Sequence, residues 1–403
     1  MTILKRIVGY LPADKGIIKF SILILLTEFV RGAYLNYTPL YINNVLEYKK
    51  EIIGAVECAF FLMETLTMIG LGWLLDRFNN RIILVSGLLI SFISLLLLKF
   101  VYSPMFLILG GGMFGLGFAP VWLMILGYLT SFSEEKRAAG MGVIYAAWLV
   151  GLGLGSVTAN FIAFRSYSLA LYVMIALWAV CIAISLFIKE GIKNIRKKEK
   201  ENVSKSFIDI LKEFANAKYL VPGMILQTFS VSILAPIVLI YLTDPKFVGL
   251  NLQQNGLTLA AIGGITVIFL TTFGRIAKSV GVEKLFIYGM LLASLGVFGI
   301  GNIATFVSVI IFGLMFAISY SAVLPAWNAI LANNIRQDNK GLMWGGFSTI
   351  EGIGRAAGAL IGGKIASDIS MQFTFNLSAT ILLALAIFYF ILNRKKMLRP
   401  NKI

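Results

Sequence analysis

Long apolar stretches alternate with short polar connections along the whole chain. An α-helix needs about 20 apolar residues to cross roughly 30 Å of hydrocarbon, so this pattern predicts an all-α membrane protein with twelve transmembrane helices. The predicted spans are 17–42, 52–75, 82–101, 104–131, 138–163, 168–188, 219–243, 255–274, 283–301, 303–333, 341–366 and 371–392. Since several spans exceed the length needed, we expect tilted or kinked helices.

The composition agrees with this pattern and excludes an ordinary soluble domain. Of the 403 residues, 59% are hydrophobic and only 13% are charged, whereas soluble domains carry about 25% charged residues. The two cysteines, Cys58 and Cys181, both fall inside predicted spans, where a small buried side chain is the simplest interpretation. We expect no disulfide, no metal site and no cofactor other than a proton gradient.

The net charge of +16 indicates orientation in a membrane rather than binding to nucleic acid. With a cytoplasmic N-terminus, most of the Lys and Arg residues lie in cytoplasmic connections and tails, and only Lys49, Lys50, Arg165 and Lys246 lie in the opposite connections. Cytoplasmic loops of membrane proteins carry such an excess. We therefore predict a multi-pass protein of the plasma membrane with both termini in the cytoplasm.

The spans form two groups of six, related by a weak repeat of about 203 residues. "PVW" at 120–122 is echoed by "PAW" at 325–327, and three glycines of the first half recur in the second. Those glycines are Gly142, Gly151 and Gly155, matched by Gly345, Gly354 and Gly358. The repeat predicts an N-terminal six-helix bundle over 1–188, a basic cytoplasmic linker over 189–218 and a C-terminal six-helix bundle over 219–403. A substrate path between two such halves is expected of transporters.

The connection after the second span contains a short charged motif. In "GWLLDRFNNR", residues 72–81, Gly72, Asp76, Arg77 and Arg81 match the pattern G-x-x-x-D-R-x-G-R-R. Asn79 stands where the pattern has glycine, and asparagine is the residue best able to replace it in a left-handed turn. Either this is a conformational gating motif, or it is a charged turn of the kind found in many membrane proteins.

Together with the plan of six plus six spans, this motif makes the chain resemble transporters of the major facilitator superfamily. Further segments of both halves resemble the proton-coupled flippases of lipoteichoic-acid anchor glycolipids in Gram-positive bacteria. They include "LTEFVRGAY" at 26–34, "PVWLMILG" at 120–127 and "WGGFSTIEGIG" at 344–354. The resemblance implies a major facilitator fold and movement of a glycolipid across the bilayer.

Three ionisable residues fall near the middle of the first two spans. Glu28, Arg31 and Glu64 each lie roughly 16 Å or more from the cytoplasmic end of their helix at 1.5 Å per residue. Charges at that depth face a bundle interior or a wet cavity. Two carboxylates then share one guanidinium, and the surplus negative charge favours binding of a proton by the less well partnered carboxylate. Because the sequence has no histidine, proton coupling would use these carboxylates.

We predict that Glu64 takes up the proton and that Glu28 and Arg31 form a fixed pair. The resemblance implies the same three positions, since an acid on the second helix and an acid–arginine pair on the first are implicated in transport in that family. The alternative is a structural polar lock between helices.

Aromatic and polar side chains in other spans are candidates for binding the substrate head group. Trp122, Tyr145 and Trp148 carry flat rings with polar edges that can stack on a sugar, although packing is also a common role for such rings. With Glu28, Arg31 and Glu64, the predicted substrate-binding set also contains Asn36, Trp122, Tyr145, Trp148, Trp327, Glu351 and Arg355. Glu351 and Arg355 lie one turn apart in the eleventh span, where they either lock each other or bind a different head group.

The predicted function is proton-coupled translocation of a glycolipid, such as a diglycosyl-diacylglycerol, by alternating access. The expected partners are the lipid bilayer, the amphiphilic substrate and protons. An exporter of lipophilic drugs from the same superfamily is the alternative, and Arg31 beside Glu28 argues against a cationic substrate. An enzyme is disfavoured because the chain has no histidine and no Asp-x-Asp motif. A scaffold or receptor would have no use for three charges at mid-membrane depth.

Overall fold

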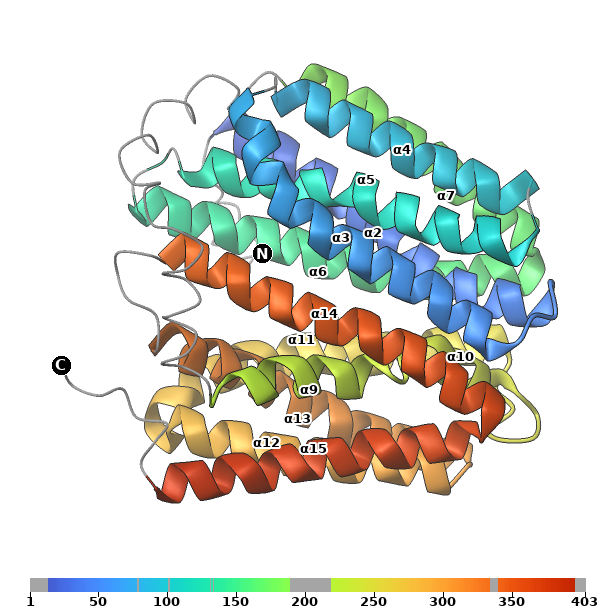
Figure 1. Cartoon of the computed structure of the whole chain (residues 1–403), viewed down its shortest axis with the longest axis vertical. Helices are drawn as coiled ribbons and strands as arrows, with labels where there is room; N and C mark the ends of the chain where they lie inside the picture. The colour runs from blue at the N-terminus through green and yellow to red at the C-terminus, as the bar shows by residue number, and fades with distance from the viewer. Residues whose placement is uncertain are drawn as a thin grey trace, which may run out of the picture. The chain divides into compact units, whose positions relative to one another are not determined.

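The computed structural model describes residues 14–77, 80–100, 102–130, 132, 134–188, 219–333 and 340–395, and its regular elements there are all α-helices (Figure 1). The helices of the first half are α2 Lys15–Asn44, α3 Lys50–Arg77, α4 Asn80–Phe100, α5 Pro104–Thr130, α6 Glu134–Arg165 and α7 Tyr167–Phe187. Those of the second half are α9 Val221–Ser232, α10 Ala235–Thr243, α11 Leu252–Val280, α12 Val282–Asn302, α13 Phe306–Asn333, α14 Lys340–Asp368 and α15 Met371–Arg394. The predicted all-α class is confirmed. The linker 189–218 lies outside the described residues.

Each of the twelve predicted spans coincides with one helix, except that 219–243 is divided between α9 and α10. The division has a local cause. Pro236 has no backbone N–H and cannot donate to the carbonyl of Ser232, the residue at which α9 ends, so the regular hydrogen bonding is interrupted there. A proline alone does not predict such a break, since Pro39, Pro120 and Pro325 lie inside continuous helices.

Within the described residues, nine segments are long and apolar enough to cross a membrane. The long helices outside this set are α2, α3 and α14. These three carry the ionisable residues singled out in the sequence, since Glu28 and Arg31 lie on α2, Glu64 on α3, and Glu351 and Arg355 on α14. The ionisable residues singled out in the sequence thus lie on the long helices that fall outside this set.

The chain forms two compact units, and each is described by itself. The first unit contains residues 1–38 and 62–205, and the second contains 39–61 and 206–403. The boundary in α2 falls at Pro39, a proline inside the helix, where one backbone hydrogen bond is necessarily missing. The second unit thus includes the end of α2 and the start of α3, which the predicted bundle 219–403 does not.

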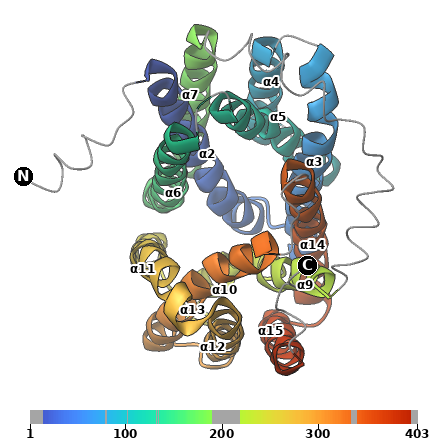
Figure 2. The same cartoon turned by 90° about the vertical axis from the view of Figure 1, so that its left-hand side faces the viewer.

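In the first unit, α4 packs against α5 and α7, and Figure 2 shows these helices end-on as neighbours. Polar side chains tie them together through backbone carbonyls: Ser91 donates to the carbonyl of Phe114, and Trp178 donates to that of Leu88 at 2.8 Å. On the other side of the unit, α6 lies against α2. A Cβ atom at Gly155 would lie only 1.8 Å from the carbonyl oxygen of Phe29, so this close approach requires glycine.

The second unit repeats this arrangement. Its α12 packs against α13 and α15 (Figure 2), and α14 lies against α9. A Cβ at Gly358 would lie 2.6 Å from the carbonyl oxygen of Phe229, as Gly155 meets Phe29 in the first unit. The repeat seen in the sequence therefore has a structural counterpart, in which α6 and α14 use glycines spaced alike to approach α2 and α9.

Candidate functional site

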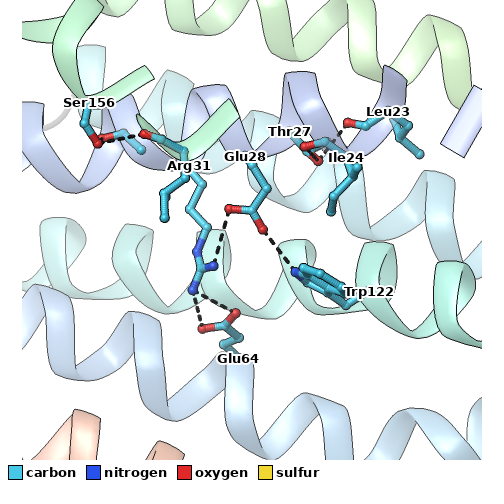
Figure 3. Close-up of polar contacts among 10 residues, drawn as sticks. Leu23, Ile24, Thr27, Glu28, Arg31, Glu64, Trp122 and Ser156 are labelled. Atoms are coloured by element: carbon cyan, nitrogen blue, oxygen red, sulfur yellow. Dashed lines mark hydrogen bonds and ion pairs between the residues drawn. The ribbon is translucent and has the colours of Figure 1, made fainter. Parts of the chain in front are cut away.

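A cluster of three buried charges lies between α2 and α3 in the first unit (Figure 3). Arg31 Nη2 donates to Glu64 Oε1 at 3.1 Å and to Oε2 at 3.2 Å, and Arg31 Nη1 donates to Glu28 Oε2 at 3.5 Å. The exposed fractions are 0% for Glu28, 8% for Arg31 and 5% for Glu64. One guanidinium thus bridges two carboxylates away from solvent, as the spacing in the sequence predicts.

Two aromatic side chains of α5 complete the cluster. Trp122 Nε1 donates to Glu28 Oε1 at 3.0 Å (Figure 3), and Arg31 Cζ lies 4.8 Å from the centre of the Phe118 ring. Phe118 and Trp122 are four residues apart and so share one face of α5. Sequence reasoning found Trp122 but missed Phe118, whose only signal was its place one turn before the tryptophan.

The backbone of α6 approaches the cluster closely. A Cβ at Gly151 of α6 would lie 2.3 Å from the carbonyl oxygen of Leu25 and 3.2 Å from Cβ of Glu28. Nearby hydroxyls donate to backbone carbonyls: Thr27 donates to Leu23 at 2.9 Å, and Ser156 donates to Leu152 at 2.8 Å. Contacts among the charged groups and with Trp122 help to hold the charged side chains in place.

Three aromatic rings extend the site from Glu28 toward α6. Trp122 lies 5.8 Å from Tyr145 and 6.1 Å from Trp148, centre to centre, and the last two rings are 6.2 Å apart. Tyr145 is 46% exposed. The buried Nε1 of Trp148 has no hydrogen-bond partner among the described residues. A free indole N–H beside an exposed phenol provides both a donor and a flat apolar surface.

The distances from Arg31 to the two acids differ from those expected from the sequence. We expected Glu28 and Arg31 to be the closer pair because they share a helix face. Arg31 instead lies nearer to Glu64, and Glu28 relies on a longer contact and on the neutral indole of Trp122. Because both acids contact the same guanidinium, a proton taken up by the cluster would titrate the coupled pair rather than one acid alone. The proton-coupling role of all three residues stays a prediction.

The other predicted substrate-binding residues are placed differently. Asn36 donates its amide to the carbonyl of Gly32 at 3.0 Å, one turn earlier on its own helix. Trp327, Glu351 and Arg355 belong to the second unit. There Trp327 Nε1 donates to Glu351 Oε1 at 2.9 Å.

Glu351 and Arg355 do not lock each other, since no ion pair within 4.0 Å joins these two described side chains. Arg355 Cζ instead lies 5.9 Å from the centre of the Phe61 ring, which is also part of the second unit. The first of the two interpretations drawn from the sequence is therefore wrong for this conformation.

The charged motif after the second span is described only in part. Arg81 at the start of α4 donates to the carbonyl of Leu186 near the end of α7. Gly72, Asp76 and Arg77 belong to α3, but the side chains of Asp76 and Arg77 are not among those that the structure describes. Of the motif, the structure thus shows that Arg81 links two helices of one unit, and its gating role stays a prediction.

Comparison with known protein families identifies the superfamily of the chain. Residues 20–266 and 220–403 match the model of the Major Facilitator Superfamily. The chain belongs to this superfamily. It is therefore an integral membrane protein of a transporter family.

Relatives within the superfamily carry a more specific name. The chain is 31% identical over 394 residues to the proton-coupled antiporter flippase LtaA of Staphylococcus epidermidis, with 94% of each protein covered. It is 28% identical over 388 residues to the flippase of the same name from Staphylococcus aureus, covering 95% of this chain and 96% of that protein.

Solved structures of more distant superfamily members share the fold. The nucleoside transporter NupG matches with a TM-score of 0.73 and 15% identity, covering 94% of this chain and all of that one. A bacterial homologue of the human lysosomal transporter Spinster, in an inward-facing and unoccupied conformation, matches with a TM-score of 0.76 and 14% identity, covering 96% and 98%. At this identity the likeness concerns the fold alone.

Proposed function

We propose that this superfamily member is a proton-coupled flippase that moves a glycolipid, such as a diglycosyl-diacylglycerol, across the plasma membrane by alternating access. The observation that carries the proposal is the buried cluster in which Arg31 bridges Glu28 and Glu64. The name of the staphylococcal relatives supports both the coupling to protons and the flipping of a lipid. No covalent step is involved, so the chain acts as a transporter and not as an enzyme.

Proton coupling follows from the charge of the cluster. With both carboxylates ionised, Glu28, Arg31 and Glu64 carry one net negative charge; with one proton bound they carry none. An uncompensated charge is costly in a low-dielectric interior. The neutral cluster therefore suits the buried arrangement, and release of the proton requires a conformation in which water reaches the carboxylates. The proton and the conformation are coupled in this way.

Recognition of the sugar is assigned to the aromatic residues beside the cluster. The free Nε1 of Trp148 can donate to a sugar hydroxyl, and the exposed ring of Tyr145 can stack against a sugar face. Glu28 connects the two functions, because its carboxylate contacts both Arg31 and Trp122. A head group that competes for Glu28 would change the charge balance of the cluster, which links substrate binding to proton binding.

The orientation of the chain is part of the proposal. Both termini lie in the cytoplasm, where most Lys and Arg residues then face the anionic inner leaflet. The exporter of lipophilic cations gains no support from the site, because the two carboxylates that would attract a cation already bind Arg31.

The deciding experiment is a flipping assay with purified protein in proteoliposomes. Fluorescently labelled diglycosyl-diacylglycerol, monoglycosyl-diacylglycerol and a lipophilic cation are compared, each with and without a pH gradient. We expect the glycolipids to move faster when a gradient is imposed and the cation to be unaffected. Gradient-driven movement of the cation alone would contradict the flippase and favour an exporter.

A further inference from the structure

The second unit contains a tryptophan–carboxylate contact that mirrors the one in the first unit. Trp327 donates to Glu351 at 2.9 Å, as Trp122 donates to Glu28 at 3.0 Å. The two tryptophans occupy equivalent places in the repeat, within "PAW" and "PVW". The two acids do not, because Glu28 lies on α2 whereas Glu351 lies on α14, the counterpart of α6.

The glycine contacts show which residues correspond. Gly151 and Gly155 of α6 meet the carbonyls of Leu25 and Phe29, while Gly354 and Gly358 of α14 meet those of Ile225 and Phe229. By this alignment Thr228 takes the place of Glu28, and Glu351 takes the place of Trp148. The Thr228 hydroxyl donates to the carbonyl of Met224 on its own helix at 2.9 Å. The acid of the second unit is therefore on a different helix, and the repeat alone does not account for it.

The indole N–H of Trp327 could form its hydrogen bond without a carboxylate as the acceptor. Trp178, which is fully buried, donates its N–H to the backbone carbonyl of Leu88 at 2.8 Å. A buried carboxylate is a costly group in the membrane and normally has a function there. The presence of Glu351 thus needs a reason beyond packing.

Next to Glu351, two polar atoms are buried without hydrogen-bond partners among the described residues: Nε of Arg355 and Oε1 of Gln227. Gln227 is 3% exposed. The Tyr320 hydroxyl forms a hydrogen bond with the Gln227 side chain and lies close enough to Glu351 and Arg355 for electrostatic interaction with both. Buried polar groups are nearly always paired, so these two unpaired atoms, one on α9 and one on α14, point to a missing partner.

The chemistry of these groups selects the partner. Arg355 and Tyr320 offer donors, while Gln227 and Glu351 offer acceptors. A sugar hydroxyl donates and accepts at once and can satisfy both kinds of group. A phosphate has only acceptors and would be repelled by Glu351, and an acyl chain would leave every group unpaired.

We propose that Gln227, Tyr320, Glu351 and Arg355 form a second sugar-binding site, in the C-terminal unit. This inference rests on the proposed function, because it takes the substrate to be a glycolipid. It implies that this unit binds hydroxyls of a sugar beside its own tryptophan–carboxylate pair. A lipid with a sugar head group should then bind more tightly than the same lipid without one.

The test measures lipid binding to the full-length protein in nanodiscs by native mass spectrometry. The lipids are diacylglycerol with no, one or two hexoses, and phosphatidylglycerol. The variants are Glu351→Gln and Arg355→Gln, with Thr349→Ala as the matched control, because the Thr349 hydroxyl is already bonded to the carbonyl of Gly345 on the same helix. We expect each of the first two variants to lower affinity for the diglycosyl lipid roughly ten-fold, with unchanged affinity for sugar-free diacylglycerol, and Thr349→Ala to bind as the wild type.

Three results would overturn the second sugar site: full affinity for the diglycosyl lipid in both variants, an equal loss for sugar-free diacylglycerol, or wild-type preference for phosphatidylglycerol over the glycolipids. The first would mean that water occupies the cluster, and the last that it binds an anion. Failure here is separable from failure of the proposed function. If the wild type flips glycolipid under a pH gradient while the variants keep its head-group preference, only the second site is wrong.

Discussion

Equivalent tryptophans of the two units donate to carboxylates that have different surroundings. In the first unit the acid that accepts from Trp122 also contacts Arg31, which binds a second acid. In the second unit the acid that accepts from Trp327 forms no ion pair with the nearby Arg355. A closed three-charge cluster is suited to holding and releasing a proton, whereas a carboxylate and a guanidinium that are near each other without direct contact are suited to a neutral, hydroxyl-rich ligand.

The comparison also shows how a repeat can separate scaffold from chemistry. The glycines through which α6 approaches α2 recur where α14 approaches α9, so the backbone framework is retained in both halves. The ionisable groups are not, since Thr228 stands where Glu28 would be. The shared backbone framework determines which positions are in contact, and substitutions at a few of these positions determine the chemistry of the site.

The largest effect should come from removing the bridging arginine. Arg31→Gln leaves two carboxylates buried next to each other, and breaking a buried ion pair costs about 3–5 kcal/mol. We expect the variant to melt at a clearly lower temperature in detergent and to flip no measurable glycolipid. Arg355→Gln, the matched change in the second unit, breaks no ion pair and should keep the wild-type melting temperature within a few degrees. Equal destabilisation by both would contradict the contrast between the units.

A smaller effect is expected from the glycines that set the framework. Gly155→Ala places a Cβ 1.8 Å from the carbonyl oxygen of Phe29, and Gly358→Ala places one 2.6 Å from that of Phe229. Overpacking of this kind costs about 1–3 kcal/mol, with the larger loss at Gly155. Gly142→Ala is the control, because nothing lies within 4 Å of its added Cβ. Thermal unfolding of the three purified variants gives the order, and destabilisation by Gly142→Ala equal to that of Gly155→Ala would show that close approach is not the cause.

Much of the fold follows from the sequence because membrane thickness imposes a length on every helix. All twelve predicted spans lie over helices, with ends that agree within several residues, but the interruption between α9 and α10 was not predicted. The meeting of Glu28, Arg31 and Glu64 was likewise predicted, from depth in the membrane and from the resemblance, whereas the contact of Trp122 with Glu28 was not. What each of them does in transport is still a prediction.

Contacts that depend on the rotation of one helix against another were not accessible. Spacing along α2 placed Arg31 beside Glu28, but it could not show that the guanidinium extends across to Glu64 at the shorter distance. In the same way, a one-turn spacing suggested a Glu351–Arg355 pair, whereas in the structure Glu351 accepts a hydrogen bond from Trp327 on α13. Side-chain direction between helices decides such contacts, and sequence spacing carries no information about it.

The central claim, that one surplus carboxylate couples lipid movement to protons, is tested most directly by gradient-driven flipping in two variants. In Glu64→Gln and in Glu28→Gln, Arg31 and the remaining acid are neutral without a proton, so nothing drives proton uptake by the cluster. We predict that each variant, folded and able to bind glycolipid, flips it at the same rate with and without a pH gradient. A gradient that accelerates flipping in both variants as it does in the wild type would contradict the account.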